Sequence, residues 1–356
     1  MTLTAKINII TSSKNWMEQQ AIDQVKALAA LPGMVNVVGL PDLHPGEVPV
    51  GAVFITRDII YPHIIGSDIG CGMSLFATGI RSHSARIDRW VRELKSSGLF
   101  RRNFGGVEPD SIGGGNHFAE IQSVEKIYDP ESFRQLGMSE RELFLLVHSG
   151  SRVHGHAIYE EFARSKKARN GLSVNSRAAA NYLDQHDRAV RWAAENRREV
   201  AVRLLRTLGR SEDPVLLLDS VHNSISTWNN SGELLFIHRK GAAAAVCDPV
   251  VIPGSRGSLT YLALPGNTAR SGWSVAHGAG RKWRRGICKD RIRNLYHRSG
   301  MKGSPFKGNV ICQDINLLYE EAPEAYKNID VVIKALVDKG LIHVVATFSP
   351  LLTCKG

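Results

Sequence analysis

The strongest constraint on the fold is a long helical stretch that lies between two apolar segments. From about Arg177 to Leu208, apolar side chains recur on one side of a helix and arginines cover much of the rest, which is typical of an amphipathic helix. The apolar positions are Leu183, Val190, Ala194, Leu204 and Leu208. Strand-like segments at Leu143–Val147 and Leu234–His238 flank this helix. The sequence therefore predicts mixed α and β structure.

The remaining segments favour the α+β class in a single compact domain over residues 1–356, with a β-sheet core and flanking helices. Further helices are predicted at about Lys14–Leu31, Ser84–Ser97 and Asn328–Asp338, and a last strand at Leu341–Phe348. Ser12 or Ser13 is the expected cap of the first of these helices. No repeat, linker or compositional boundary divides the chain.

Charge indicates a polyanionic partner. The net charge is +11, and a basic surface gains affinity for nucleic acid by displacing counterions from phosphates. The excess is concentrated in two runs, from Arg281 to Lys302 with Trp283 and Tyr296 interspersed, and from Arg188 to Arg210. A solvated helix face is the competing interpretation of both runs.

Cysteine use and hydropathy indicate the compartment. The five cysteines form an odd set without a CxxC pair, which argues for reduced thiols rather than a disulfide framework. No apolar run long enough to span a membrane and no secretory leader are seen, so a cytoplasmic protein without a membrane partner is expected.

A metal site is suggested by the turn Gly66–Met73, which is expected to follow a strand from Ile59 to Ile65. The turn presents Asp68 and Cys71 among glycines. A carboxylate and a thiolate together suit a borderline divalent cation such as zinc, manganese or cobalt. The alternative is that Cys71 is a small buried hydrophobe and Asp68 an ordinary turn residue.

Four histidines stand in similar contexts, at strand ends or between glycines: His117, His148, His222 and His277. Most of the others, such as His83, His186, His297 and His343, are in unremarkable surroundings. With Asp68 and Cys71, the four provide more metal-binding groups than one ion needs. The surplus suggests two metals, or one metal and a histidine nucleophile.

Phosphate-binding features recur in the same regions. Cations follow a strand in the segment 238–242, and the turn 252–258 could present amides to an anion. No Walker loop is present, which argues against an ordinary P-loop nucleotidase. The residues alone thus describe a basic enzyme with a thiolate, carboxylate and imidazole metal centre, phosphate loops and a spare histidine.

These residues lie in blocks that resemble the RtcB-type RNA ligases. The blocks follow family order across nearly the whole chain, and they are Pro41–His44, Asp68–Met73, Gly113–Glu120, His148–Arg152, His222–Asn223, His238–Ala242, Ile252–Ser255, His277–Arg281 and Lys355–Gly356. The resemblance implies an RtcB-like domain with a central metal and nucleotide cleft. It also implies joining of an RNA 3′-phosphate or 2′,3′-cyclic phosphate to a 5′-hydroxyl, with GTP and two Mn²⁺ ions.

The resemblance also assigns roles to residues. Cys71 would bridge the two ions, which Asp68, His117, His148 and His222 complete, and His277 would carry GMP. Asn116 would contact the GTP phosphates, Phe118 would pack on guanine, and Glu120 and Lys355 would bind the base edge. Further nucleotide contacts are expected from His222, Asn223, Lys240, Pro253, Gly254, Ser255, Thr260, Gly278, Ala279 and Gly280. RNA contacts are expected from Arg152, Arg281, Arg284 and Arg285.

Departures from the family pattern point to one branch. The loop Pro45–Val50 and the segment Val153–His156 differ from the usual form, and Thr260 replaces a serine. These features are similar to the branch coupled with a release-factor-like partner, which implies RNA repair, with broken ribosomal RNA rather than spliced transfer RNA as the substrate. An archease-like activator is a further expected partner. Two other classes stay open, a metal-dependent cyclic phosphodiesterase and a non-catalytic RNA-binding protein with a structural metal.

Overall fold

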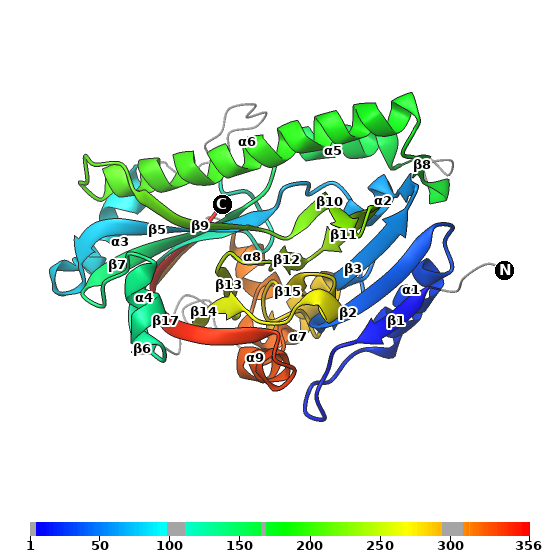
Figure 1. The fold of residues 1–356 in the computed structure, drawn as a ribbon. Coiled ribbons are helices and arrows are strands. Elements are labelled where there is room, and N and C mark those ends of the chain that lie inside the picture. Colours follow the sequence, from blue (N-terminus) through cyan, green and yellow to red (C-terminus); the bar gives the residue numbers. More distant parts are fainter. Residues whose placement is uncertain (1–4, 98–110, 165–168, 294–308, 313) are drawn as a thin grey trace.

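The computed structural model describes residues 5–97, 111–164, 169–293, 309–312 and 314–356 (Figure 1). Two β-sheets form the body of the described chain, and helices cover them. Two short strand pairs, β12 (Ala242–Ala244) with β15 (Ser274–Ala276) and β4 (Ile59–Ile60) with β8 (Leu172–Ser173), add to these sheets.

The larger sheet has the strand order β13-β14-β17-β6-β7-β5-β9, and β16 pairs with β17. Neighbouring strands in this sheet are antiparallel, except for β16 and β17, which are parallel. The strands are β5 (Gly72–Arg81), β6 (Phe118–Ile127), β7 (Glu142–Ser149), β9 (Val215–Val221), β13 (Val250–Pro253), β14 (Thr260–Pro265), β16 (Asn309–Cys312) and β17 (Ile342–Lys355).

The smaller sheet has the order β1-β2-β3-β11-β10. Its strands are β1 (Lys6–Ile9), β2 (Met34–His44), β3 (Val50–Arg57), β10 (Asn223–Asn230) and β11 (Glu233–Lys240). Nine helices are described, α1 (Gln19–Ala29), α2 (Pro62–Ile65), α3 (Ile87–Ser96), α4 (Pro130–Gln135), α5 (Val153–Phe162), α6 (Arg177–Thr207), α7 (Arg285–Arg293), α8 (Ile315–Glu320) and α9 (Ile329–Asp338).

The larger sheet is buried on both faces. Along β7, Phe144 and Leu146 pack in one apolar cluster, while Leu145 and Val147 pack in another, because successive side chains of a strand point to opposite faces. Apolar residues of α6 join the second cluster, so this helix covers one face of the sheet. The predicted β-sheet core with flanking helices in an α+β fold is confirmed.

Helix α6 runs the length of the molecule along the top of Figure 1. It begins after Ser176, whose side chain accepts a hydrogen bond from the Ala179 backbone amide, and it spans 31 residues. The predicted long helix is therefore confirmed to within a residue of its end.

Two predicted boundaries were wrong for reasons of local chemistry. The strand expected at Ile59–Ile65 stops at Ile60, because Pro62 stands in the first turn of α2, where its fixed φ and missing N–H suit a helix start. The Asp68–Cys71 turn thus follows a short helix and precedes β5. The first helix begins at Gln19 rather than Lys14. Its N-cap position is Glu18, so neither Ser12 nor Ser13 caps it.

The other predicted elements were found with shifted ends. The helix expected at Ser84–Ser97 is α3, the one at Asn328–Asp338 is α9 with Asn328 as its cap, and the last strand, β17, continues to Lys355. Among the described residues, no helix is long and apolar enough to cross a membrane.

Candidate active site

Three of the predicted metal ligands lie at neighbouring strand ends, at one end of the larger sheet. Cys71 precedes β5, His148 lies at the end of β7, and His222 follows β9. The register pairs Gly72 with Ser149 on one side and with Val221 on the other. Because these strands are adjacent and antiparallel, all three side chains meet at the same end of the sheet.

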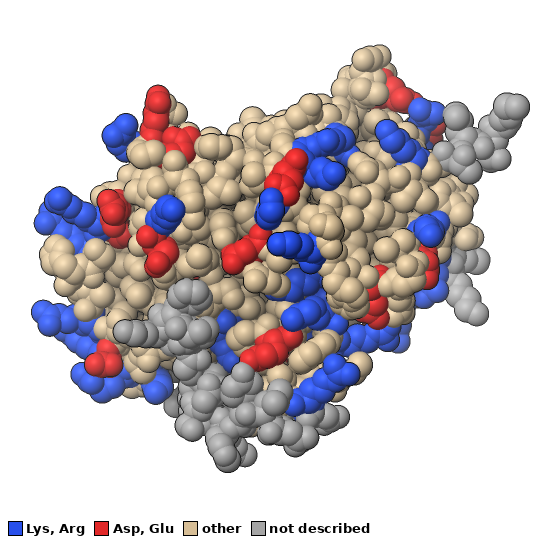
Figure 2. All heavy atoms as spheres, turned by 90° about the horizontal axis from the view of Figure 1, so that it is seen from below, with Lys and Arg blue, Asp and Glu red and all other residues tan. Residues whose placement is uncertain are grey.

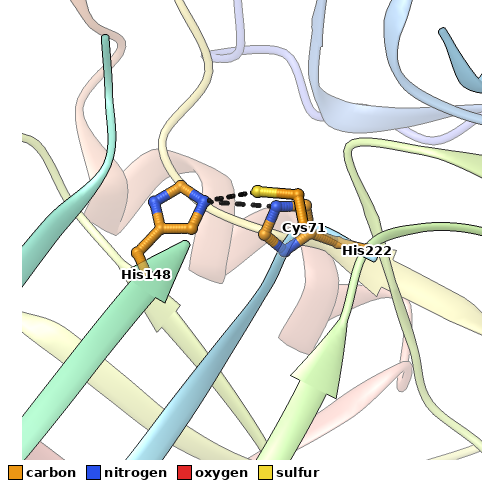
Figure 3. Close-up of side chains that lie close together, drawn as sticks. All are labelled: Cys71, His148 and His222. Atoms are coloured by element: carbon orange, nitrogen blue, oxygen red, sulfur yellow. Dashed lines mark hydrogen bonds between the residues drawn. The ribbon is translucent and has the colours of Figure 1, made fainter. Parts of the chain in front are cut away.

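The side chains of Cys71, His148 and His222 point at one another in a buried cluster (Figure 3). The Cys71 sulfur lies 3.2 Å from His148 Nε2, which lies 3.3 Å from His222 Nε2. On its other side the same sulfur lies 3.3 Å from His117 Nε2, which lies 3.2 Å from Asp68 Oδ2. Cys71 therefore belongs to two groups of three potential ligands at once, one with His148 and His222 and one with Asp68 and His117.

This donor set fits divalent cations. One soft sulfur, three imidazoles and one hard carboxylate suit a borderline ion such as zinc or manganese. Burial lowers the pKa of His148 and of His222 well below the usual range, which keeps both rings neutral as ligands. Burial and the Asp68 charge raise the pKa of the Cys71 thiol, so a cation bound here would displace its proton.

The backbone at Gly150 lies close against the Asp68 carboxylate. A Cβ atom on Gly150 would lie 2.2 Å from Asp68 Oδ1, so a glycine is required after His148 and Ser149. Burial alone would raise the pKa of Asp68, but the charge and hydrogen bond of His117 lower it below its usual value. The carboxylate is thus ionised and fixed against the histidine.

His277 lies beside this cluster and is oriented by a residue that the sequence analysis did not single out. It follows β15, and its ring centroid is 4.8 Å from that of His222. Its Nδ1 lies 2.7 Å from Oδ2 of Asp42, which is fully buried in β2. Asp42 stood in the Pro41–His44 block, and that block was the available signal.

The loop after His277 can approach Asp42 only because of a glycine. A Cβ atom on Gly280 would lie 2.2 Å from the Asp42 carbonyl oxygen, and the φ of Gly280 is +72°. Since the carboxylate accepts from Nδ1–H, the lone pair of His277 is on Nε2.

One cavity of about 750 Å³ connects these groups. All fifteen residues predicted to contact the nucleotide line it, together with Asp68, Cys71 and His148 of the metal cluster. The fold therefore brings the predicted nucleotide contacts and the metal cluster into a single cleft.

A buried polar network lies at the Glu120 side of the cavity. Gln122 Nε2 donates to Glu120 Oε1 at 2.7 Å and to Thr260 Oγ1 at 2.8 Å, and Thr353 donates to the other Glu120 oxygen. Lys355 Nζ donates to the His117 carbonyl at 3.1 Å. Burial raises the pKa of Glu120 and lowers that of Lys355.

The predicted RNA-binding arginines differ in their surroundings. Arg281 is largely buried, with its guanidinium bonded to Glu321, Tyr326 and the Glu320 carbonyl. Arg284 and Arg285 are exposed and line the same cavity. Arg152 Nη1 lies 3.5 Å from His117 Nδ1.

Lys and Arg side chains gather across the middle of the face seen in Figure 2, among Asp and Glu. In the run from Arg188 to Arg210, several exposed arginines pair with carboxylates, as Arg188 does with Asp184 and Arg198 does with Asp213. These pairs favour the interpretation of the run on α6 as a solvated helix face.

Tyr296, Arg298 and Lys302 of the first run lie outside the described residues.

The helix that begins with the departing segment Val153–His156 contacts the departing loop Pro45–Val50. The Tyr159 hydroxyl of α5, the helix that begins at Val153, donates to Glu47 at 3.1 Å. Glu47 lines the cavity. The departing loop Pro45–Val50 therefore lines the cleft and is held there by α5.

Comparison with known proteins agrees with this arrangement. A family model described as "tRNA-splicing ligase RtcB" matches residues 24–108 and 102–356. The RNA-splicing ligase RtcB2 of Escherichia coli is 38% identical over 99% of this chain and 97% of its own length. The RNA-splicing ligase RtcB of Mycobacterium tuberculosis is 29% identical over 94% of this chain and 100% of its own length. With the ordered sequence blocks meeting in one cleft, these matches show that the chain belongs to the RtcB family.

Proposed function

We propose that this protein is an RNA ligase that uses GTP and manganese to join RNA 3′-phosphate or 2′,3′-cyclic phosphate ends to 5′-hydroxyl ends. The family relationship supports RNA ligation. The observation that carries the chemistry is the position of His277, which is held by Asp42, lies beside His222 of the metal cluster and lines the same cavity as Glu120. A nucleophile in that position is required for nucleotide transfer.

In the first step, Nε2 of His277 attacks the α-phosphorus of GTP. A phosphorus–nitrogen bond forms, the bond to the pyrophosphate oxygen breaks, and pyrophosphate leaves. The positive charge that develops on the ring is stabilised by Asp42, which accepts from Nδ1–H. His277 then carries GMP as a phosphoramidate.

In the later steps the RNA replaces the histidine. Water first opens a cyclic phosphate where one is present. An oxygen of the RNA 3′-phosphate attacks the GMP phosphorus, which releases His277, and the 5′-hydroxyl then attacks the activated 3′-phosphorus with GMP as the leaving group. Activation by GMP converts a poor leaving group into a good one.

Two manganese ions would be held by the two ligand groups, one by Asp68, Cys71 and His117 and the other by Cys71, His148 and His222. Bound cations would neutralise the charge that builds on the phosphoryl oxygens. The role of the ligand residues is to fix the positions of the cations at the end of the sheet.

Guanine is expected at the Glu120 side of the cleft. A carboxylate can accept from both the ring and exocyclic N–H groups of guanine, and adenine lacks this donor pair. We expect Glu120→Gln to raise KM for GTP about 10- to 100-fold with a smaller change in kcat, as expected when one charged hydrogen-bond partner is lost. Steady-state kinetics would measure this, and an unchanged KM would exclude the base contact.

The two alternative functions lack a use for this arrangement. A cyclic phosphodiesterase would need the metal cluster but not the His277–Asp42 pair. A non-catalytic RNA-binding protein with a structural metal would not need that pair either. From the family resemblance, the proposal includes repair of broken RNA, a release-factor-like partner and an archease-like activator.

The direct test is incubation of the protein with manganese and α-labelled GTP, followed by denaturing electrophoresis. A covalent label that is acid-labile and alkali-stable is expected, since phosphoramidates behave in this way. Addition of RNA with 3′-phosphate and 5′-hydroxyl ends should then release the label and yield joined RNA. Absence of covalent label would refute the ligase mechanism.

Asp42→Asn should slow labelling while leaving metal binding intact. The amide cannot accept from Nδ1–H in the same way and favours the wrong tautomer of His277, so a decrease of about 10²- to 10⁴-fold is expected. Single-turnover labelling rates measure it. A rate equal to that of the wild type would show that Asp42 does not orient the nucleophile.

A further inference from the structure

The arginine at position 197 has surroundings unlike those of the other arginines in its run. Arg197 is fully buried, although it belongs to the run from Arg188 to Arg210 that the sequence predicts to be a surface. The physical reason is its position on the helix. It lies four residues after Ala193 and three before Val200, both buried, so it shares their face of α6.

The Arg197 guanidinium contacts residues adjacent to Cys71 and to His148, and a residue three positions before His222. Nη1 donates at 2.9 Å to the Gly70 carbonyl, which precedes Cys71, and at 2.9 Å to the Ser149 carbonyl, which follows His148. Nε and Nη2 donate to the two oxygens of Asp219 at 2.9 and 2.8 Å, on the strand that leads to His222. One side chain therefore ties together the three strand ends that carry this ligand group.

The neighbouring residue extends the same support to a fourth segment. Asn196 donates at 2.9 Å to the Ser111 carbonyl and at 2.9 Å to the Ser149 hydroxyl, and it accepts from the Ser111 amide at 3.1 Å. Ser111 begins the glycine-rich segment that leads to His117. Both Asn196 and Arg197 are fully buried, so their bonds are shielded from competing water.

The packing around the guanidinium leaves no room for other side chains. A Cβ atom on Gly72 would lie 3.2 Å from the Arg197 Cζ atom, and one on Gly70 would lie 2.8 Å from the Val190 Cα atom. The turn that holds Cys71 thus rests directly on α6. The Asp219 carboxylate neutralises the guanidinium, so the pair adds no net charge beside a cationic centre.

We propose that Arg197, assisted by Asn196, is the positioning residue that holds the ligands of the metal centre in their binding geometry. Partners that orient ligands change metal affinity by about 10- to 100-fold when they are lost. Only arginine has a planar fork of donors that can reach two carbonyls and a carboxylate at once. This inference rests on the metal-binding part of the proposed function.

The test is a titration of the metal-free protein with cobalt(II), followed by the sulfur-to-cobalt charge-transfer band and the ligand-field bands. Arg197→Lys keeps the charge but loses the fork, and we expect about 10- to 100-fold weaker cobalt binding with altered bands. Arg198→Lys is the matched control, because Arg198 is the next residue, lies on the surface and pairs there with Glu195, Glu199 and Asp213. It should bind cobalt as the wild type does.

The outcomes separate this inference from the proposed function. If Arg197→Lys is less stable to heat but binds cobalt with wild-type affinity and bands, Arg197 is only structural and the positioning role is wrong. If the wild type binds no cobalt, the metal centre itself is refuted. Should Arg197→Lys fail to fold, Asp219→Asn replaces it in the test, and unchanged cobalt binding in that variant would overturn the proposal.

Discussion

His277→Ala is expected to abolish GMP labelling and RNA ligation, by at least about 10⁴-fold, because it removes the covalent nucleophile. No other described histidine combines a position in the cleft with a buried carboxylate on its Nδ1 atom. Labelling with α-labelled GTP and a ligation assay measure the two losses. Metal binding should be preserved, since His277 belongs to neither ligand group.

His343→Ala provides the matched control, because the His343 side chain is exposed and lies outside the cavity lining. This variant should label and ligate at the wild-type rate. A label that survives in His277→Ala would assign the nucleophile to another residue, and loss of cobalt binding in that variant would mean that the substitution acts through the metal centre.

Cys71→Ala is expected to remove metal binding and ligation together. Its sulfur lies within hydrogen-bonding distance of histidines from both ligand groups, so its loss affects both positions. The loss of affinity should exceed the roughly 100-fold that follows removal of an outer partner. Metal content per chain after dialysis, together with ligation rate, gives the measurement.

His117→Ala distinguishes a bridge from an ordinary ligand. It removes a ligand from one group only, so this variant should retain one ion where Cys71→Ala retains none. Cys247→Ala controls for the change of thiol to methyl, since Cys247 is exposed. Full manganese occupancy in Cys71→Ala would contradict the bridging role.

The sequence predicted the local features of the site well, because they depend on residue type and immediate context. The proposed ligand residues stand at strand ends and in glycine-rich turns, and the spacing of apolar residues indicated the long helix. The strand at Ile59–Ile65 was wrong because β-forming residues outweighed the effect of Pro62, which starts a helix there.

The residues that support the site could not be found in this way, because their partners are far away in the sequence. Asp42 binds His277, and Arg197 binds carbonyls of Gly70 and Ser149, so their roles exist only after the sheet has formed. A carbonyl acceptor leaves no mark in a sequence at all. In the sequence, Arg197 also lies among arginines that are on the surface. It differs from them only in the side of α6 on which it lies.

The position of the proposed ligands on separate strand ends has a consequence for when the protein could bind metal during folding. The two ligand groups, whose residues are spread from Asp68 to His222 in the sequence, form only when β5, β6, β7 and β9 have paired. This pairing requires contacts between residues far apart in the sequence. An early folding intermediate with only its local helices would therefore hold no complete group and would bind the ion weakly. Cobalt colour should appear in the last kinetic phase of refolding, and chelators should accelerate unfolding of the native protein more than they slow its collapse.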